Sequence, residues 1–194
     1  MKKLLITRFD PFGGAEVNPS WQAVSRLPDQ VGDYVLRKLE IPTVFHRATE
    51  VVLEAAAQFL PEVILCVGQA GGRDSVTPER IAVNIRDARI PDNAGNQPRG
   101  EFVASDGPAA YFATVPVEKM AQAIREAGIP ATVSNSAGAF VCNDTLYGLL
   151  HTFAGSKVRC GFIHVPYIPE QGQPNLALEQ IVASLIAAIA VCGE

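Results

Sequence analysis

Five consecutive apolar residues, Val63 to Val67, constrain the fold of this 194-residue chain more than any other stretch. A run of this kind is typical of a strand that is covered on both faces of a sheet. Other β-rich runs alternate along the chain with helical patterns, which indicates βαβ units built around a mostly parallel sheet. The sequence therefore predicts an α/β fold.

The expected elements follow one another without an internal repeat or a linker, so we expect one domain over residues 1–194. The run at 81–85 alternates apolar and polar residues, which predicts a strand at an edge or with one exposed face. The polar stretch 87–105 is rich in Pro, Asn and Gly, and long loops of this kind are often functional. Strands are expected at 3–9, 34–41, 63–67, 81–85, 131–134 and 158–165, and helices at 20–27, 47–60, 117–127, 145–154 and 176–191.

Charge and hydropathy exclude several classes of protein. The net charge is -4, so the chain offers no basic face for nucleic acid. The longest apolar segment, 181–192, is shorter than a bilayer span, and the first apolar run ends at Arg8, too early for a signal-peptide core. We therefore expect a cytoplasmic protein with neither nucleic-acid nor membrane partners.

The four cysteines show neither a disulfide framework nor zinc-ligand spacing, which predicts free thiols and no metal site. Cys142 differs from the others because it follows a stretch of small residues and directly precedes a predicted helix. A helix N-terminus stabilises a thiolate and lowers the thiol pKa, so Cys142 is a candidate nucleophile. The alternative is a small buried hydrophobic residue. We favour that alternative for Cys66, Cys160 and Cys192.

The ends of the predicted strands supply partners for such a thiol, because ligands of open α/β sheets bind outside the carboxyl ends of the strands. A cysteine nucleophile needs a base, and His164 ends a predicted strand while the other two histidines do not. A carboxylate usually orients the imidazole. Glu79 is a candidate for this role, and Asp10, Asp92 and Asp106 compete with it.

Six separated motifs, in the same order along the chain, resemble the pyroglutamyl peptidase type I family over nearly the full length. They are FDPFGG at 9–14, NPSW at 18–21, VGQAGGR at 67–73, TPERIAVNIRDARIPDN at 77–93, SNSAGAFVCN at 134–143 and HVPYIPEQ at 164–171.

The resemblance implies a single cysteine peptidase domain that removes N-terminal pyroglutamate from peptides, with a triad at Glu79, Cys142 and His164. It implies that Arg89 stabilises the oxyanion, a role for which the backbone N–H of Cys142 is also a candidate. It also implies a three-layer αβα sandwich with a mixed, mostly parallel sheet, as in phosphorylase/hydrolase-like folds, and a homotetramer. No metal or organic cofactor is implied.

Pyroglutamate is a neutral lactam, so its pocket requires a flat apolar slot and a few directed polar groups. For each phenylalanine alone core packing is the better interpretation, but two of them flank a proline in a loop that ends in glycine. We expect Gln69 to bond the lactam. The slot is expected to be formed by Phe9, Phe12, Ile90, Phe140 and Val141.

Two residues depart from the family pattern. Arg8 stands where the family usually has glycine, and we expect its long side chain to crowd the pocket rim. Asp144 stands where an aromatic residue or histidine is common, and we expect its charge to oppose thiolate formation at Cys142 and to raise the pH optimum.

Two alternative functions remain at this stage. A phosphorylase-like transferase would use the GQAGGR segment and Arg73 to hold an anion. A non-catalytic pyroglutamyl-binding homologue would have kept the pocket but lost turnover through Arg8 or Asp144.

Overall fold

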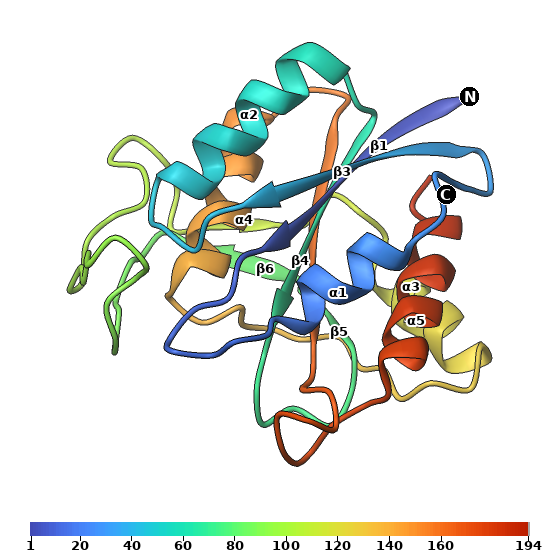
Figure 1. Cartoon of the computed structure of the whole chain (residues 1–194). Coiled ribbons are helices and arrows are strands. Elements are labelled where there is room, and N and C mark those ends of the chain that lie inside the picture. Colours follow the sequence, from blue (N-terminus) through green and yellow to red (C-terminus); the bar gives the residue numbers. More distant parts are fainter. Residues whose placement is uncertain (194) are drawn as a thin grey trace.

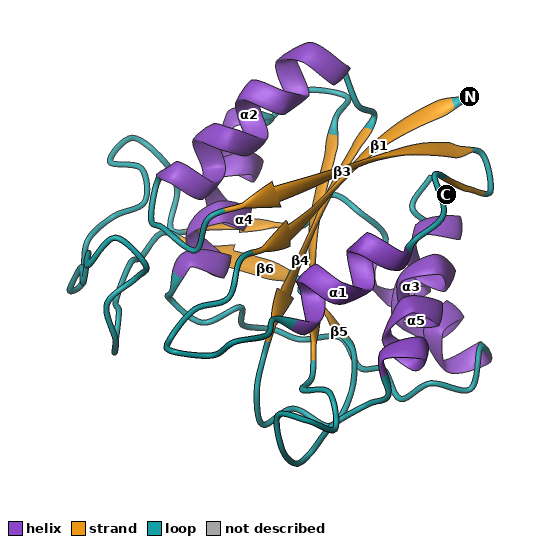
Figure 2. Cartoon of the chain, viewed as in Figure 1, coloured by secondary structure: helices purple, strands orange, loops and turns teal. Residues whose placement is uncertain are grey.

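A six-stranded mixed sheet forms the centre of the computed structural model, which describes residues 1–193 (Figure 2). The strand order is β2-β3-β1-β4-β8-β5. The four central strands are parallel, and β2 and β5 pair antiparallel at the two edges. The strands are β1 (Lys2–Phe9), β2 (Gln30–Val31), β3 (Tyr34–Ile41), β4 (Val63–Gln69), β5 (Thr77–Pro78) and β8 (Arg159–Val165).

Helices cover both faces of this sheet, as Figure 1 shows. One face carries α1 (Pro19–Arg26), α3 (Val117–Glu126) and α5 (Leu178–Ala190). The other face carries α2 (Arg47–Phe59) and α4 (Val141–Thr152). The predicted α/β class and the three-layer arrangement with a mostly parallel sheet are confirmed.

The apolar run at 63–67 forms the first part of β4 and is buried on both sides, as predicted. Val63, Leu65 and Val67 enter the core beneath α1, α3 and α5. Ile64 and Cys66 enter the core beneath α2 and α4. Full burial of a side chain of this size contributes about 1.5–3 kcal/mol. Because β4 joins the two cores, it fixes the position of both helical layers.

A small second sheet lies beside the main one and consists of β6 (Ile81–Val83) and β7 (Ala110–Phe112). The predicted strand at 81–85 therefore ends two residues early, and it pairs only with β7, consistent with its alternating pattern. The segment that connects β6 to β7 contains the long loop predicted at 87–105. Asn84 connects the two ends of this loop, because its Oδ1 accepts hydrogen bonds from the backbone N–H groups of Val103 and Ala104 at 2.8 and 2.9 Å.

One predicted strand is absent, and one predicted helix begins at a different residue. Residues 131–134 form no strand, because their neighbour β5 is only two residues long and leaves single bridges at Ala131 and Ser134. The helix expected at 145–154 begins earlier, at Val141, so that Cys142 lies inside its first turn. The short strands β2, β5 and β7 were not predicted. β5 and β7 depend on pairing with distant segments, whereas β2 is a two-residue strand that pairs with the adjacent β3.

The thiols of all four cysteines are free, as predicted. None of the described helices combines the length and the apolar content that a bilayer crossing requires.

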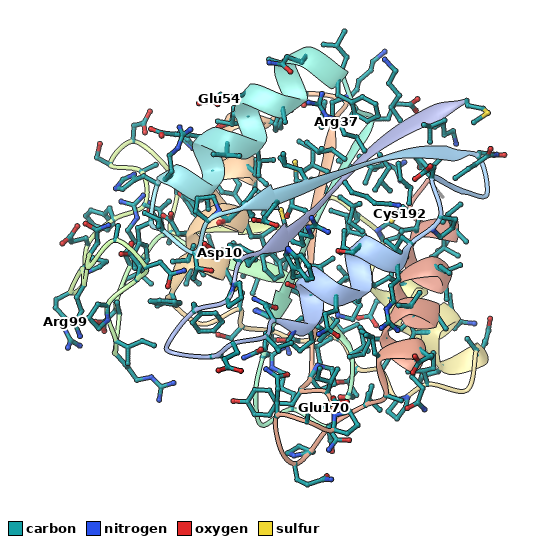
Figure 3. The ribbon with its side chains drawn as sticks, viewed as in Figure 1. Asp10, Arg37, Glu54, Arg99, Glu170 and Cys192 are labelled. Carbon is teal, nitrogen blue, oxygen red and sulfur yellow. The ribbon has the colours of Figure 1, made fainter. Side chains whose placement is uncertain are left out.

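The carboxyl ends of β1, β3 and β4 point to one edge of the sheet, away from the N-terminus (Figure 2). After β1 the chain forms β3, which pairs with one side of β1. It then returns through α2 to form β4 on the other side of β1, so the order of strands reverses between β1 and β4. Asp10 follows β1 at this edge (Figure 3), where it accepts the backbone N–H of Thr43 at 2.7 Å. A binding site is expected at such a reversal.

Candidate active site

Glu79 and His164 form a buried pair at this edge of the sheet. Their positions follow from strand pairing, because Thr77 of β5 lies opposite His164 of β8 and the N–H of Glu79 bonds Phe162 O at 2.9 Å. Glu79 Oε1 lies 2.7 Å from His164 Nδ1, and the two side chains are 0% and 4% exposed. An ionised carboxylate only accepts hydrogen bonds, so Nδ1 carries the proton and Nε2 of the neutral ring is free to take another.

Arg73 binds the same carboxylate oxygen. Its Nη1 lies 2.6 Å from Glu79 Oε1 and also bonds the hydroxyl of Thr77, while Nη2 donates to Ser136 O at 3.0 Å. The guanidinium therefore links the carboxylate to the segment before Cys142. The sequence indicated Arg73 only as an anion ligand, and its contact with Glu79 depends on tertiary structure.

The charges of this pair follow from burial and hydrogen bonding. Burial alone would raise the pKa of Glu79, but the hydrogen bonds from His164 and Arg73 outweigh it and leave that pKa below its ordinary value. Burial lowers the pKa of His164 and outweighs the opposing effect of the carboxylate. The resting pair is therefore an ionised carboxylate and a neutral imidazole.

Cys142 reaches the same edge from α4. A Cβ placed on Gly68 would lie 3.1 Å from Cys142 Sγ, and Gly68 in β4 is the register partner of His164 in β8. The thiol therefore lies against the strand next to the histidine. Cys142 and His164 both line a cavity of about 530 Å³.

The thiol is not poised as a thiolate in the resting site. Burial, followed by the charge of Glu79, raises the pKa of Cys142 to about 12. Arg73 and the N–H of Cys142 itself act in the opposite direction but do not outweigh burial. The N–H group at the helix start therefore acts in the predicted direction, but burial outweighs it, and a base must remove the proton when the thiol reacts.

The first turn of α4 leaves backbone N–H groups available. Its N-cap is Phe140, whose side chain cannot accept a hydrogen bond, and the first intrahelical bond is the one from Asp144 N to Phe140 O at 3.1 Å. The N–H groups before it, including that of Cys142, are the donors that a helix start leaves without intrahelical partners. Arg89 lines the same cavity with an exposed side chain.

Four of the six predicted pocket residues line the cavity, namely Phe12, Gln69, Ile90 and Phe140. The ring of Phe140 is held between two others, at centroid distances of 6.1 Å from Phe12 and 5.3 Å from Phe45. Aromatic rings that pack against one another in this way form the apolar walls of small-molecule sites.

Phe9 and Val141 do not line the cavity, contrary to expectation. Phe9 is buried in the core, 6.1 Å from the ring of Phe162, and that ring lies 4.7 Å from His164. Alternation along β1 directs Phe9 inward, while Val141 is fully buried against the sheet in the first turn of α4. Both residues pack in the core beneath α2 and α4, next to the residues of the site.

Arg8 does not crowd the rim either. Its guanidinium lies over the Trp21 ring at 4.9 Å, bonds the hydroxyl of Ser25 and approaches Glu40 at 3.4 Å. These partners belong to α1 and β3, so the long cation lies on the surface beside α1. It is not among the residues that line the cavity.

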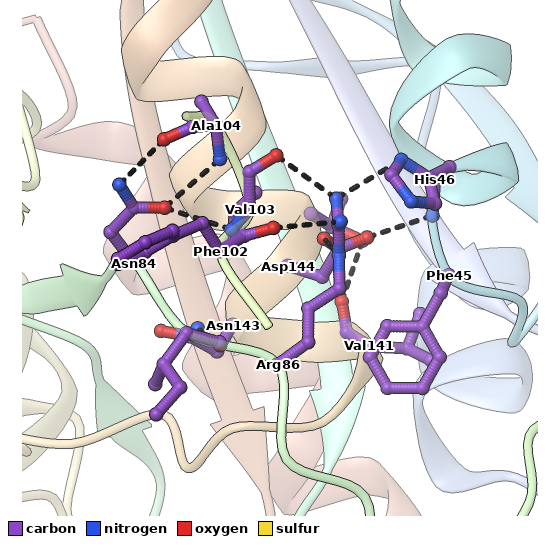
Figure 4. A network of polar contacts seen from close by, with 12 residues as sticks. Phe45, His46, Asn84, Arg86, Phe102, Val103, Ala104, Val141, Asn143 and Asp144 are labelled. Atoms are coloured by element: carbon purple, nitrogen blue, oxygen red, sulfur yellow. Dashed lines mark hydrogen bonds and ion pairs between the residues drawn. The ribbon is translucent and has the colours of Figure 1, made fainter. Parts of the chain in front are cut away.

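Asp144 is neutralised by a buried cation, as Figure 4 shows. Its Oδ1 lies 2.5 Å from Arg86 Nε, and its Oδ2 accepts the backbone N–H of His46 at 2.9 Å. Arg86 also donates to the carbonyls of Phe102 and Val103 at 3.0 and 3.2 Å. Because Arg86 compensates the charge of Asp144, the expected opposition to thiolate formation at Cys142 is weakened.

The role of Asp144 is instead to hold elements together. With Arg86 and His46 it connects the first turn of α4, the start of α2 and the long loop (Figure 4). His46 Nδ1 accepts from Arg86 at 3.0 Å, since a guanidinium can only donate. This fixes the turn that carries Cys142.

No three His, Cys, Asp or Glu side chains within residues 1–193 are grouped as a metal site would require.

A three-layer α/β fold with a thiol, an imidazole and a carboxylate at the strand ends is the arrangement of a cysteine hydrolase. The family model of pyroglutamyl peptidases matches residues 2–194. The pyrrolidone-carboxylate peptidase of Staphylococcus saprophyticus is 49% identical over 99% of this chain and 93% of its own. That of Bacillus licheniformis is 50% identical over 97% of this chain and 91% of its own.

Solved structures agree with this match. The crystal structure of pyroglutamyl peptidase I from Bacillus amyloliquefaciens is similar with a TM-score of 0.94 and 47% identity, over 99% of this chain and 97% of that one. Pyrrolidone carboxyl peptidase from Thermococcus litoralis gives 0.94 and 39%, over 99% and 93%. The chain belongs to the pyroglutamyl peptidase family.

Gly68→Ala should reduce peptidase activity about a hundredfold, the effect of a displacement of about 1 Å in a catalytic group. The added Cβ would meet the Phe162 ring at 2.8 Å and Cys142 Sγ at 3.1 Å, so the thiol and the ring beside His164 must shift. Steady-state kinetics and urea unfolding would be measured together. Wild-type activity in this variant would show that the position of Cys142 Sγ does not depend on the absence of a side chain at Gly68.

Asp144→Asn should lower the free energy of unfolding by about 3 kcal/mol or more, because it leaves the buried Arg86 charge without its partner. The matched control is Asp29→Asn, which removes the 95% exposed carboxylate of the Asp29–Lys38 pair and should cost less than about 1 kcal/mol. Both values come from urea unfolding. Equal losses in the two variants would contradict the structural role assigned to Asp144.

Proposed function

We propose that this protein removes N-terminal pyroglutamate from peptides by acyl transfer through Cys142. The observation that carries the proposal is that Cys142 and His164 line one cavity, with Glu79 hydrogen-bonded to the far side of the imidazole. The enzyme is a cysteine peptidase of the pyroglutamyl peptidase type.

In the first step, His164 Nε2 takes the proton of Cys142 as Sγ attacks the carbonyl carbon that joins pyroglutamate to the next residue. The S–C bond forms, the C–N bond breaks, and the imidazolium gives the proton to the leaving amine. Water, deprotonated by His164, then hydrolyses the thioester to release pyroglutamate and the thiol. Proton removal and attack are coupled because the resting thiol is protonated.

Glu79 orients and stabilises the imidazole in both steps of the reaction. Its hydrogen bond keeps the proton on Nδ1, so Nε2 faces the reacting groups, and its charge stabilises the imidazolium that forms in the transition state. The lowered pKa of His164 keeps its imidazole neutral to a lower pH than an ordinary imidazole.

The oxyanion of the tetrahedral intermediate is bound by the backbone N–H of Cys142 and by Arg89 in this proposal. Support comes from the absence of a side-chain cap on α4 and from the position of Arg89 on the cavity wall. A single donor of this kind is worth about 3 kcal/mol in the transition state.

The lactam occupies the apolar part of the cavity, between Phe12, Ile90 and Phe140, with Gln69 as a polar contact. An uncyclised glutamine or a proline would leave polar groups of this pocket unpaired, which is a strong basis for discrimination.

The alternative functions are less well supported. A phosphorylase-like transferase would need Arg73 for its anion, yet Arg73 is engaged with Glu79, Thr77 and Ser136. A non-catalytic binder was suggested by Arg8 and Asp144, and both side chains are directed to partners outside the cavity.

We further propose that residues 1–194 act as one peptidase domain in a cytoplasmic homotetramer. The domain assignment is supported by the family match over residues 2–194. The tetramer and the location rest on the family resemblance and on charge and hydropathy. Light scattering coupled to size-exclusion chromatography would give the oligomeric state.

Hydrolysis of a fluorogenic pyroglutamyl amide under reducing conditions tests the proposed function. Wild type should release the fluorophore, Cys142→Ser should not, and the matching prolyl amide should remain intact. Cys160→Ser, which alters a buried packing thiol, serves as the control and should retain activity. Release by Cys142→Ser at the wild-type rate would contradict the proposal.

A further inference from the structure

Gln171 makes a set of hydrogen bonds that determines which way its own amide faces. It lies in the turn after β8, which is closed by the bond from its backbone N–H to Ile168 O at 2.9 Å. Its side-chain Oε1 accepts the backbone N–H of Ile168 at 3.2 Å, and its Nε2 donates to Val17 O at 3.2 Å. A backbone N–H can only donate and a carbonyl can only accept, so the two ends of this amide cannot be exchanged.

This orientation is passed on to Gln69. The remaining hydrogen of Gln171 Nε2 is directed at the Gln69 amide at 2.9 Å, and the atom that receives it must be an acceptor. Gln69 Oε1 is therefore fixed toward Gln171. The Nε2 group of Gln69, which no described residue accepts, is left as a donor.

Gln69 borders the candidate active site. Gln69, the last residue of β4, lines both the catalytic cavity and a neighbouring cavity of about 420 Å³, whereas Gln171 lines only the neighbouring one. With Oε1 engaged by Gln171, the N–H groups are the end of the Gln69 amide that remains for a ligand in the catalytic cavity.

We propose that Gln171 is a positioning residue that presents Gln69 as a hydrogen-bond donor to the carbonyl oxygen of the lactam ring. The proposal rests on the proposed function for the identity of the ligand. A free amide could turn either end to the substrate, and the fixed one can only donate. Proline has the same ring without this carbonyl, so the fixed donor would remain unpaired and the ring would bind less well.

The test is a double-mutant cycle with Gln171→Met and Gln69→Met, which keep side-chain length but remove hydrogen bonding. On a pyroglutamyl amide, Gln171→Met should raise KM about fivefold with little change in kcat, since a neutral hydrogen bond to the ring is made before and during the reaction. In the Gln69→Met background, Gln171→Met should have no further effect on KM. An unchanged KM in the single variant, or effects that multiply in the double variant, would overturn the proposal.

Gln122→Met is the matched control, because Gln122 is exposed on α3 and bonds only Glu126. Its KM should equal that of the wild type. If Gln171→Met fails to fold, Gln171→Glu replaces it, and its carboxylate cannot donate to Gln69. An unchanged KM in that variant would equally overturn the proposal.

Failure of the proposed function is distinguished by calorimetry with free pyroglutamate. If wild type hydrolyses no pyroglutamyl amide, binding is compared between Cys142→Ser and Cys142→Ser/Gln171→Met. Binding about fivefold weaker in the double variant supports the role of Gln171. Equal binding, or no binding to either protein, overturns it.

Discussion

The hydrogen bond between Glu79 Oε1 and His164 Nδ1 is the interaction on which the rest of the site depends. It is made across the pairing of β5 with β8, and both side chains are almost completely buried. Arg73 supplies the charge that makes an ionised carboxylate tolerable there, and it ties that carboxylate to the chain leading into α4. Glu79 Oε1 therefore links His164 of β8, through Arg73, to the segment that precedes α4.

Burial has opposite consequences for the acid and the base of this site. It raises the pKa of Cys142 and lowers that of His164, so both groups are neutral at rest. A protonated thiol is protected from adventitious oxidation, and proton transfer occurs when a carbonyl is in place to be attacked. In the proposed mechanism the helix N-terminus acts on the charge that develops on the substrate oxygen, because its effect on the sulfur is outweighed by desolvation.

The fold was largely predictable because β4 and the helices carry strong local patterns. The candidate site was predictable because Cys142 lies at the start of α4 and His164 near the end of β8. The start of α4 at Val141 was missed since Phe140 gives no capping signal. The roles of Arg73 and Gln171 were missed for a different reason. Each acts through partners that are distant in sequence, and only the folded chain brings them together.

The charge state of Cys142 is the central claim, and its reaction with iodoacetamide as a function of pH tests it most directly. Modification of the Cys142 peptide would be followed by mass spectrometry, with Cys142→Ser to exclude the other three thiols. Because the pKa is raised to about 12, the rate should climb through neutral pH into the alkaline range without levelling off. A rate that is already constant from acid to neutral pH would reveal a resident thiolate and contradict the account.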